Sequence, residues 1–152
     1  MNKNSVDRRI IVKFLYQFNF SHLPLDEDGS VSTREINDLV DQFCLTLETE
    51  SSVENLRFHI DSSKELIKKI IKVNELIEAA IIKNSHKGSL DKISKIDLTI
   101  LKLGIYELFF RKEIPPKVVI NEALLLANEF SGPKSSGFIN GVLDTIYKEL
   151  KD

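Results

Sequence analysis

Apolar residues recur at intervals of three or four along most of this chain, and residues that break helices are rare. The 152 residues include only six glycines and four prolines, and long stretches between them are uninterrupted. A spacing of three and four matches the turn of an amphipathic α-helix, whereas a half-buried strand would alternate every two residues. The sequence therefore predicts an all-α fold.

Capping and breaking residues divide the chain into about seven expected helices. A serine followed three residues later by an acid is typical of a helix start, because the hydroxyl and the carboxylate satisfy free N–H groups. This pattern occurs at Ser32, Ser51, Ser62 and Ser94. Gly88, Pro115-Pro116 and Gly132-Pro133 mark ends and breaks. The expected helices cover about 5–20, 32–48, 52–86 (as one or two helices), 95–111, 117–130 and 135–150, with a polar loop at 21–31 and a single turn at 90–93.

The same periodicity predicts which side chains form the core. Helix 95–111 is apolar nearly all round, which is typical of a central helix that is buried on several sides. The inward residues of segment 52–86 are expected to be Leu66, Ile67, Ile70, Ile71, Leu76 and Ile77. In the last helix they are expected to be Ile139, Val142, Leu143, Ile146, Tyr147 and Leu150.

Length and composition favour one domain, over residues 1–152, in the cytoplasm. Apolar residues make up 42% of the chain and charged residues 29%, which suits a globular protein. No apolar run reaches the ~18 residues that a membrane helix needs, and the first residues lack the apolar core of a secretory signal. The single cysteine, Cys44, cannot form an internal disulfide, which fits a reducing compartment.

Charge is distributed unevenly along the chain. The net charge of −2 excludes a polycation that coats nucleic acid by charge alone. Residues 1–13 carry four cations and one acid, whereas residues 26–54 carry nine acids and one cation. We interpret the acidic segment as a solvated helix face with a loop rather than as a cation site.

The sequence contains no complete catalytic or metal-binding motif, so no enzyme activity, metal or cofactor is expected. The three histidines are far apart and lack ligand spacing. The segment 132–137 has the GxxxxG spacing of a phosphate-binding loop, but Phe138 stands where the lysine is required and a helix precedes it. Lys134 with the N–H groups of Ser135 and Ser136 at a helix start suits one phosphate, or else an ordinary connection between helices.

The first helix interleaves aromatic and basic residues opposite its core stripe. Ile10, Ile11, Phe14, Leu15 and Phe18 form the stripe, and Arg9, Lys13, Tyr16 and Phe20 lie on the other side. Aromatic rings stack on unpaired bases while cations hold phosphates, as in single-stranded RNA binding. Packing of Tyr16 and Phe20 on a neighbouring helix remains the alternative. The same two interpretations, RNA binding and packing, apply to Phe130 and Phe138, which flank the turn at Lys134.

Three segments in the second half of the chain carry a family resemblance. Residues 97–108 (DLTILKLGIYEL), 114–123 (IPPKVVINEA) and 134–144 (KSSGFINGVLD) resemble, in order and spacing, three motifs of the NusB family of bacterial transcription antitermination factors. Arg8 and Leu15-Tyr16-Gln17 resemble the family's first helix more weakly. Residues 21–60 show no recognisable match.

The resemblance implies two small three-helix bundles and a factor without enzyme activity. Such factors bind boxA-type RNA of ribosomal RNA leader transcripts together with NusE, a small-subunit ribosomal protein, and join RNA polymerase with other Nus factors. The resemblance also implies that Asp97 faces NusE, and it is compatible with a monomer or a homodimer. The expected RNA-contacting residues, including Arg9 and Lys13 from the helical pattern, are Arg8, Arg9, Lys13, Tyr16, Lys102, Lys117, Phe130, Lys134, Ser135 and Phe138.

Other classes of protein share parts of this pattern. A helical protein-interaction module would bind NusE with little RNA affinity of its own. Some ribosomal RNA cytosine methyltransferases carry a NusB-like domain, but this chain is too short for the attached catalytic domain. An unrelated helical enzyme is the third class. Measuring RNA binding with and without NusE separates an RNA-binding factor from a module that binds NusE and gains nothing from RNA.

Overall fold

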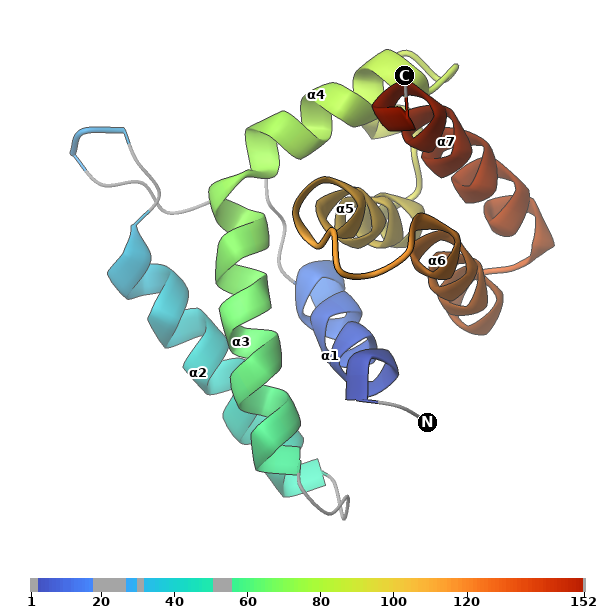
Figure 1. Ribbon diagram of the computed structural model, residues 1–152. Coiled ribbons are helices and arrows are strands. Elements are labelled where there is room, and N and C mark those ends of the chain that lie inside the picture. Colours follow the sequence, from blue (N-terminus) through green and yellow to red (C-terminus); the bar gives the residue numbers. More distant parts are fainter. Residues whose placement is uncertain (1–2, 18–26, 30–31, 51–55, 152) are drawn as a thin grey trace. The chain divides into compact units, whose positions relative to one another are not determined.

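The computed structural model describes residues 3–17, 27–29, 32–50 and 56–151, and every regular element in these ranges is helical (Figure 1). Seven α-helices and one short 3-10 turn are present there, which confirms the all-α prediction. The chain separates into two compact units, Met1–Lys72 and Val73–Asp152. Each unit buries its own apolar residues, so each is described by itself.

The first unit consists of α1 (Lys3–Gln17), α2 (Thr33–Glu50) and α3 (Leu56–Lys72). Helix α3 packs on both α1 and α2. The rings of Phe14 and Phe43 meet edge to face, with centroids 5.3 Å apart, and join α1 to α2. The other buried apolar residues of this unit include Ile10, Ile11, Val12, Leu15, Ile36, Val40, Cys44, Ile60, Ile67, Ile70 and Ile71.

The serine caps predicted for this unit have different outcomes. Ser32 Oγ accepts a hydrogen bond of 3.4 Å from the Glu35 N–H, so the predicted start of α2 is confirmed. The predicted helix start at Ser62 is wrong, because this serine lies inside α3 and its hydroxyl bonds to a carboxylate of α1 instead. Ser51 and most of loop 21–31 lie outside the described residues.

The second unit is built around α5 (Lys95–Phe110), which contacts α4 (Asn74–Asn84), α6 (Pro116–Phe130) and α7 (Pro133–Lys151). A short turn, η2 (Leu90–Lys92), precedes α5. Every residue of α5 from Thr99 to Leu108 is buried, which confirms the prediction of a central helix. Ser94 Oγ accepts from the Asp97 N–H at 3.3 Å, so the predicted cap of α5 is also confirmed.

Segment 52–86 forms two helices rather than one long helix. The break is at Val73, whose φ of −106° and ψ of 19° depart from helical values without any glycine or proline. As a result the second unit has four described α-helices, because α4 joins the three that follow it. Helix α4 buries Ile77 and Ile81.

Two residues predicted to point inward are exposed. Leu76 is 52% exposed and Leu150 is 46% exposed, so both core predictions are wrong. Leu76 lies one residue from the buried Ile77, which turns it to the side of α4, and Leu150 is in the last turn of α7. Both line an open groove that also involves Ala79, Ala80 and Phe109.

Gly104 allows α5 and α7 to approach each other closely. A Cβ added at this position would lie 3.1 Å from Leu143 Cδ1. Helix interiors disfavour glycine by roughly 0.5–1 kcal/mol relative to alanine. The contact with Leu143 gives this glycine a packing role in the second unit.

Candidate nucleic-acid interface

One side of α1 presents an aromatic ring and cations to solvent. Tyr16 is 47% exposed and Lys13 is also exposed, while Arg9 is half-buried. Positions 9, 13 and 16 lie four and three residues apart, so they share a helix face, which we call the α1 face. Phe18 and Phe20, also named in the sequence prediction, lie outside the described residues. The α1 face thus has the residue types that bind single-stranded RNA.

Arg8 lies away from this face. Its side chain is only 4% exposed, and its neighbour Asp7 is 2% exposed. A buried guanidinium presents little surface to a phosphate. The contact of Arg8 with RNA stays a prediction, and the exposed residues of α1 are the better placed ones.

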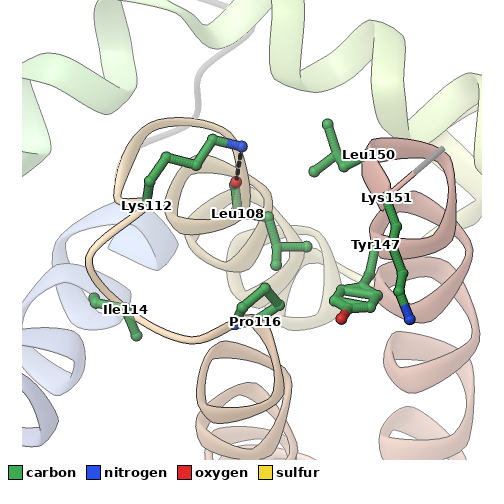
Figure 2. A pocket seen from close by; sticks show the side chains of 7 residues that line it. All are labelled: Leu108, Lys112, Ile114, Pro116, Tyr147, Leu150 and Lys151. Atoms are coloured by element: carbon green, nitrogen blue, oxygen red, sulfur yellow. Dashed lines mark hydrogen bonds between the residues drawn. The ribbon is translucent and has the colours of Figure 1, made fainter.

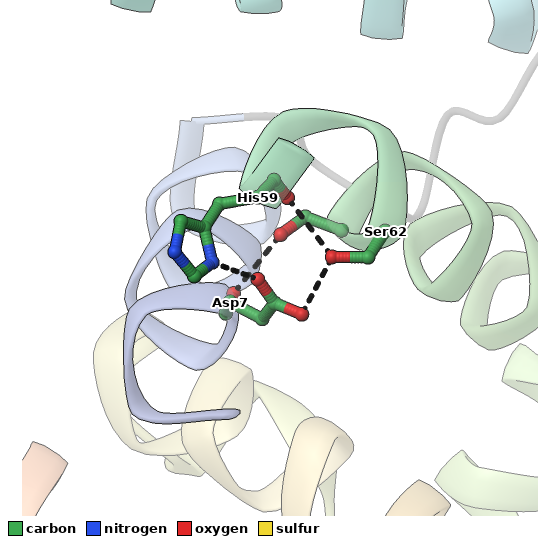
Figure 3. A network of polar contacts seen from close by, with 4 residues as sticks. Asp7, His59 and Ser62 are labelled. Carbon is green, nitrogen blue, oxygen red and sulfur yellow. Dashed lines mark hydrogen bonds and ion pairs between the residues drawn. The ribbon is translucent and has the colours of Figure 1, made fainter. Parts of the chain in front are cut away.

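Asp7 ties α1 to α3 through a polar network (Figure 3). Asp7 Oδ1 is 2.9 Å from His59 Nδ1, and Ser62 Oγ donates to Asp7 Oδ2 at 2.7 Å. Ser63 Oγ donates to the Asp7 carbonyl at 3.5 Å. The Ser62 hydroxyl also lies 3.3 Å from the His59 carbonyl, so two acceptors compete for its one hydrogen, and the carboxylate is the nearer. The network fixes two helices in place.

The ring of Phe138 contacts a lysine and a histidine from another part of the second unit. Lys87 Nζ lies 4.4 Å from the ring centroid, and the His86 ring meets it edge to face at 5.9 Å. Lys134 is exposed one helical turn before Phe138 on α7. We call His86, Lys87, Lys134 and Phe138 the Phe138 cluster. Sequence reasoning missed His86 and Lys87, since only the fold brings residues so distant in sequence together.

The turn before α7 is closed by its own hydrogen bonds. Ser131 Oγ and Ser135 Oγ are 2.6 Å apart, and Ser136 Oγ donates to Asn128 Oδ1 at 2.6 Å. The Ser136 N–H donates to the Gly132 carbonyl, so the expectation of a free N–H at Ser136 is wrong. Ser135 and Phe130 are half-buried beside this turn. These bonds hold the start of α7, where Lys134 is an exposed cation.

The two further lysines of the prediction have contrasting environments. Lys102 is 2% exposed, and its Nζ is 3.3 Å from Glu78 Oε1. Glu78 also accepts from Asn74 Nδ2 at 2.7 Å. Burial lowers the pKa of the Lys102 ammonium, and Glu78 acts in the opposite direction. Lys117 is exposed near the start of α6. Only Lys117 is open to a polyanion in this conformation, and the contact of Lys102 with RNA stays a prediction.

Asp97 occupies the first turn of α5 and is 5% exposed. Its Oδ1 has no hydrogen-bond partner among the described residues. A carboxylate in the first turn interacts favourably with the helix dipole. Because this oxygen is buried, Asp97 presents little surface to a partner in this conformation, and its contact with NusE stays a prediction.

A pocket of about 200 Å³ in the second unit lies where the ends of α5 and α7 meet the start of α6 (Figure 2). Leu108, Ile114 and Pro116 supply apolar walls, and Tyr147 and Lys151 enter from α7. Lys112 Nζ donates to the Leu108 carbonyl at 3.1 Å, and Lys151 Nζ lies 5.7 Å from the Tyr147 ring. Both lysines therefore already have contacts within the protein.

In the part of the chain that the structure describes, no group of three or more histidine, cysteine or acidic side chains could hold a metal ion. No helix there is both long and apolar enough to span a bilayer.

Comparison with known families gives this geometry a context. The sequence matches the NusB family over residues 5–148. The chain belongs to the NusB family. The match includes α1 as well as the three motifs of the second unit, so it extends beyond the segments that carry the resemblance in the sequence.

Individual NusB proteins are similar over most of their length. The transcription antitermination protein NusB of Acetivibrio thermocellus is 38% identical over 141 residues, covering 93% of this chain and 86% of that protein. The NusB of Clostridium botulinum strain Alaska E43 is 43% identical over 119 residues, covering 70% and 90%.

Solved structures share the fold. T. maritima NusB superimposes with a TM-score of 0.73 at 29% identity, covering 98% of this chain and 92% of that chain. A chain in the crystal structure of a plectonemic RNA supercoil has a TM-score of 0.76 at 22% identity, covering 99% and 98%. The fold that this chain shares with T. maritima NusB is therefore not confined to the three motifs of the second unit.

Proposed function

We propose that the chain is a transcription antitermination factor that binds boxA-type RNA of ribosomal RNA leader transcripts. It acts together with NusE and joins the antitermination complex on RNA polymerase with other Nus factors. The observation that carries the proposal is the Phe138 cluster, in which an aromatic ring lies among Lys87, His86 and Lys134. Family membership supports the same function.

The chemistry of the two surfaces suits an unpaired RNA strand. Rings such as Tyr16 and Phe138 stack on bases, and neighbouring lysines hold phosphates. The body of the protein is net acidic, at −2, so its bulk charge does not attract RNA. The site then selects RNA by stacking and by a few placed cations rather than by overall charge.

Direct contact with RNA is assigned to the more exposed members of the predicted set. These are Arg9, Lys13, Tyr16, Lys117, Phe130, Lys134, Ser135 and Phe138, to which the structure adds His86 and Lys87 as neighbours of Phe138. Arg8 and Lys102 are assigned positioning roles from inside their units, because both are buried. Asp97 is assigned to NusE.

Fluorescence anisotropy with a labelled boxA-type RNA and a scrambled RNA, each with and without NusE, tests the proposal. We expect preference for the boxA-type RNA and tighter binding when NusE is present. If three or four cations touch phosphates, the logarithm of the binding constant falls with the logarithm of salt at a slope of roughly −2 to −3. A slope near zero, or equal binding of both RNAs, would overturn the proposal.

A second candidate is a protein-interaction module that binds NusE with little RNA affinity. The cover of the Phe138 ring by Lys87 and the burial of Arg8 favour this alternative. Such a module would bind NusE with an affinity that RNA does not change. Light scattering after size-exclusion chromatography would also show whether the α1 face joins two copies, because a dimer formed there would dissociate as RNA binds.

A further inference from the structure

An open pocket of about 200 Å³ lies between α2 and α3, helices that pack side by side in the first unit (Figure 1). Ile36 and Ile71 line it, and both are almost completely buried. Lys68, Lys69 and Lys72 also line it, with Glu65 as the one acidic lining residue. The pocket therefore combines an apolar floor with a cationic rim, and no residue of the predicted RNA site belongs to it.

Two of the rim lysines lack an ion pair with the described residues. Lys68 Nζ is 3.8 Å from Glu65 Oε1, so this lysine is partly neutralised. Lys69 and Lys72 form no ion pair with any residue that the structure describes, and both are exposed. Lysine in the last turn of a helix interacts favourably with the helix dipole, which accounts for their presence on α3 but not for the pocket beside them.

Asn37 lines the pocket from α2, and its Oδ1 is a buried acceptor without a hydrogen-bond partner among the described residues. A buried acceptor without a donor is unfavourable. Because the oxygen is buried, an N–H group of an occupant reaches it only when the Asn37 side chain turns toward the pocket, and that hydrogen bond would then satisfy it.

These three features together specify a ligand with an anionic group, a flat apolar part and N–H donors. A nucleotide has all three, in its phosphate, its base face and its base edge. The pocket volume suits one base, since a cavity of about 150 Å³ holds a benzene ring. An acidic peptide with an apolar side chain matches the rim and the floor, but it uses the buried acceptor less directly.

We propose that the pocket between α2 and α3 is a further nucleotide-binding subsite for single-stranded RNA. Lys69 and Lys72 hold the phosphate, Ile36 and Ile71 contact the base, and Asn37 Oδ1 accepts from the base edge. This inference rests on the proposed RNA-binding function and adds a contact on the first unit beyond the α1 face.

The first experiment compares Lys69→Gln/Lys72→Gln with Lys148→Gln/Lys151→Gln, which removes the same charge from the end of α7. Circular dichroism verifies folding, and each single substitution is measured as well. We expect the pocket variant to bind a boxA-type RNA with flanking nucleotides several-fold more weakly. Its salt slope should be shallower by about 0.7, because both lysines are assigned to one phosphate. The α7 variant should bind as the unsubstituted protein does.

The second experiment needs no variant. RNAs with 4-thiouridine at successive positions are irradiated with the unsubstituted protein, and crosslinked peptides are mapped by mass spectrometry. We expect at least one position to crosslink to α2 or α3 next to Ile36 or Ile71. Equal RNA binding by the pocket and α7 variants, together with no crosslink to these helices, would overturn the subsite.

A third measurement distinguishes this failure from that of the proposed function. If Tyr16→Ala weakens RNA binding and the pocket variant does not, the subsite is wrong and RNA binding stands. If the unsubstituted protein binds no RNA, both proposals fail. If the pocket variant loses affinity for NusE and not for RNA, the pocket binds protein and the subsite is wrong.

Discussion

The ammonium of Lys87 lies over the ring of Phe138, 4.4 Å from its centroid, although 50 residues separate the two in sequence. A cation in this position is attracted to the ring by about 0.5–1 kcal/mol at an exposed site. The contact holds the ring in one orientation and keeps a positive charge beside it. The charge favours a phosphate nearby, whereas a base that stacks on this face of the ring would have to displace the ammonium.

Phe138→Ala should weaken RNA binding roughly 5- to 150-fold, because stacking is worth ~1–3 kcal/mol per base. Phe138 is half-buried, so the variant should lose less stability than the ~3–5 kcal/mol of a fully buried phenylalanine. Anisotropy titrations and thermal melting of the same samples check this. Lys87→Met is the companion variant, and its salt slope should be shallower by about 0.7. Tighter binding by Lys87→Met would mean that Lys87 competes with the base for the ring.

Tyr16→Ala should lose RNA affinity by a similar factor while its melting temperature stays close to that of the unsubstituted protein. The side chain is 47% exposed, so little packing is removed. Phe14→Ala on the same helix is the matched control, because Phe14 is 1% exposed and its loss should cost ~3–5 kcal/mol of stability. A large drop in melting temperature for Tyr16→Ala would show that the ring packs rather than binds.

Asp97→Asn should weaken NusE binding and leave RNA binding by the free protein unchanged. Loss of the charge in the first turn of α5 should reduce stability by ~0.3–1 kcal/mol. Asp97→Lys should cost more stability, because the position is only 5% exposed. Calorimetric titration with NusE measures the partner contact. A fall in RNA affinity alone would contradict the assigned role.

Lys102→Met should remove a contribution to stability that grows with pH in alkaline solution. Burial lowers the pKa of Lys102 below 10.5, so at a pH just below 10.5 this lysine is less protonated in the folded protein than in the unfolded chain. The contribution of Lys102 to the free energy of unfolding therefore increases as the pH rises toward 10.5. Burial raises the pKa of Tyr106, which acts in the opposite direction in both proteins and cancels in the comparison. Urea unfolding at several pH values measures the difference, and parallel curves would refute it.

Asp7→Ala should destabilise the first unit more than Ser62→Ala does. Asp7 accepts from Ser62 and contacts His59, so its removal leaves two polar groups without this partner, whereas Ser62→Ala removes one hydrogen bond. Each lost partner costs about 1–3 kcal/mol. Urea unfolding of both single variants and the double variant measures the coupling. Simple additivity would show that the network does not act as a unit.

The sequence predicts the helices well because their signals are local. Ser32 and Ser94 cap the helices that follow them, and Pro115-Pro116 starts α6 as expected. The break at Val73 has no such signal, since no glycine or proline marks it. The place where such a helix breaks depends on packing between helices, and the residue pattern along one segment does not show that packing.

The site could be predicted only in part for the same reason. The helical pattern places Tyr16 opposite the core of α1 correctly, because periodicity alone decides that. The burial of Lys102 depends on Glu78, and the environment of Phe138 depends on Lys87. These partners come from other helices, and a single sequence gives no measure of their distance.

The network of Asp7, His59 and Ser62 also sets the axial register of α1. A stripe of aliphatic side chains tolerates sliding by one helical turn, because one branched residue can replace another in the same groove. Hydrogen bonds of 2.7 and 2.9 Å to a single carboxylate do not tolerate such sliding, because a shift of one turn would break them. At 1.5 Å per residue, Tyr16 then lies a fixed distance of about 13.5 Å along the helix from Asp7. The network therefore fixes where the α1 face, the proposed RNA contact, lies along α3.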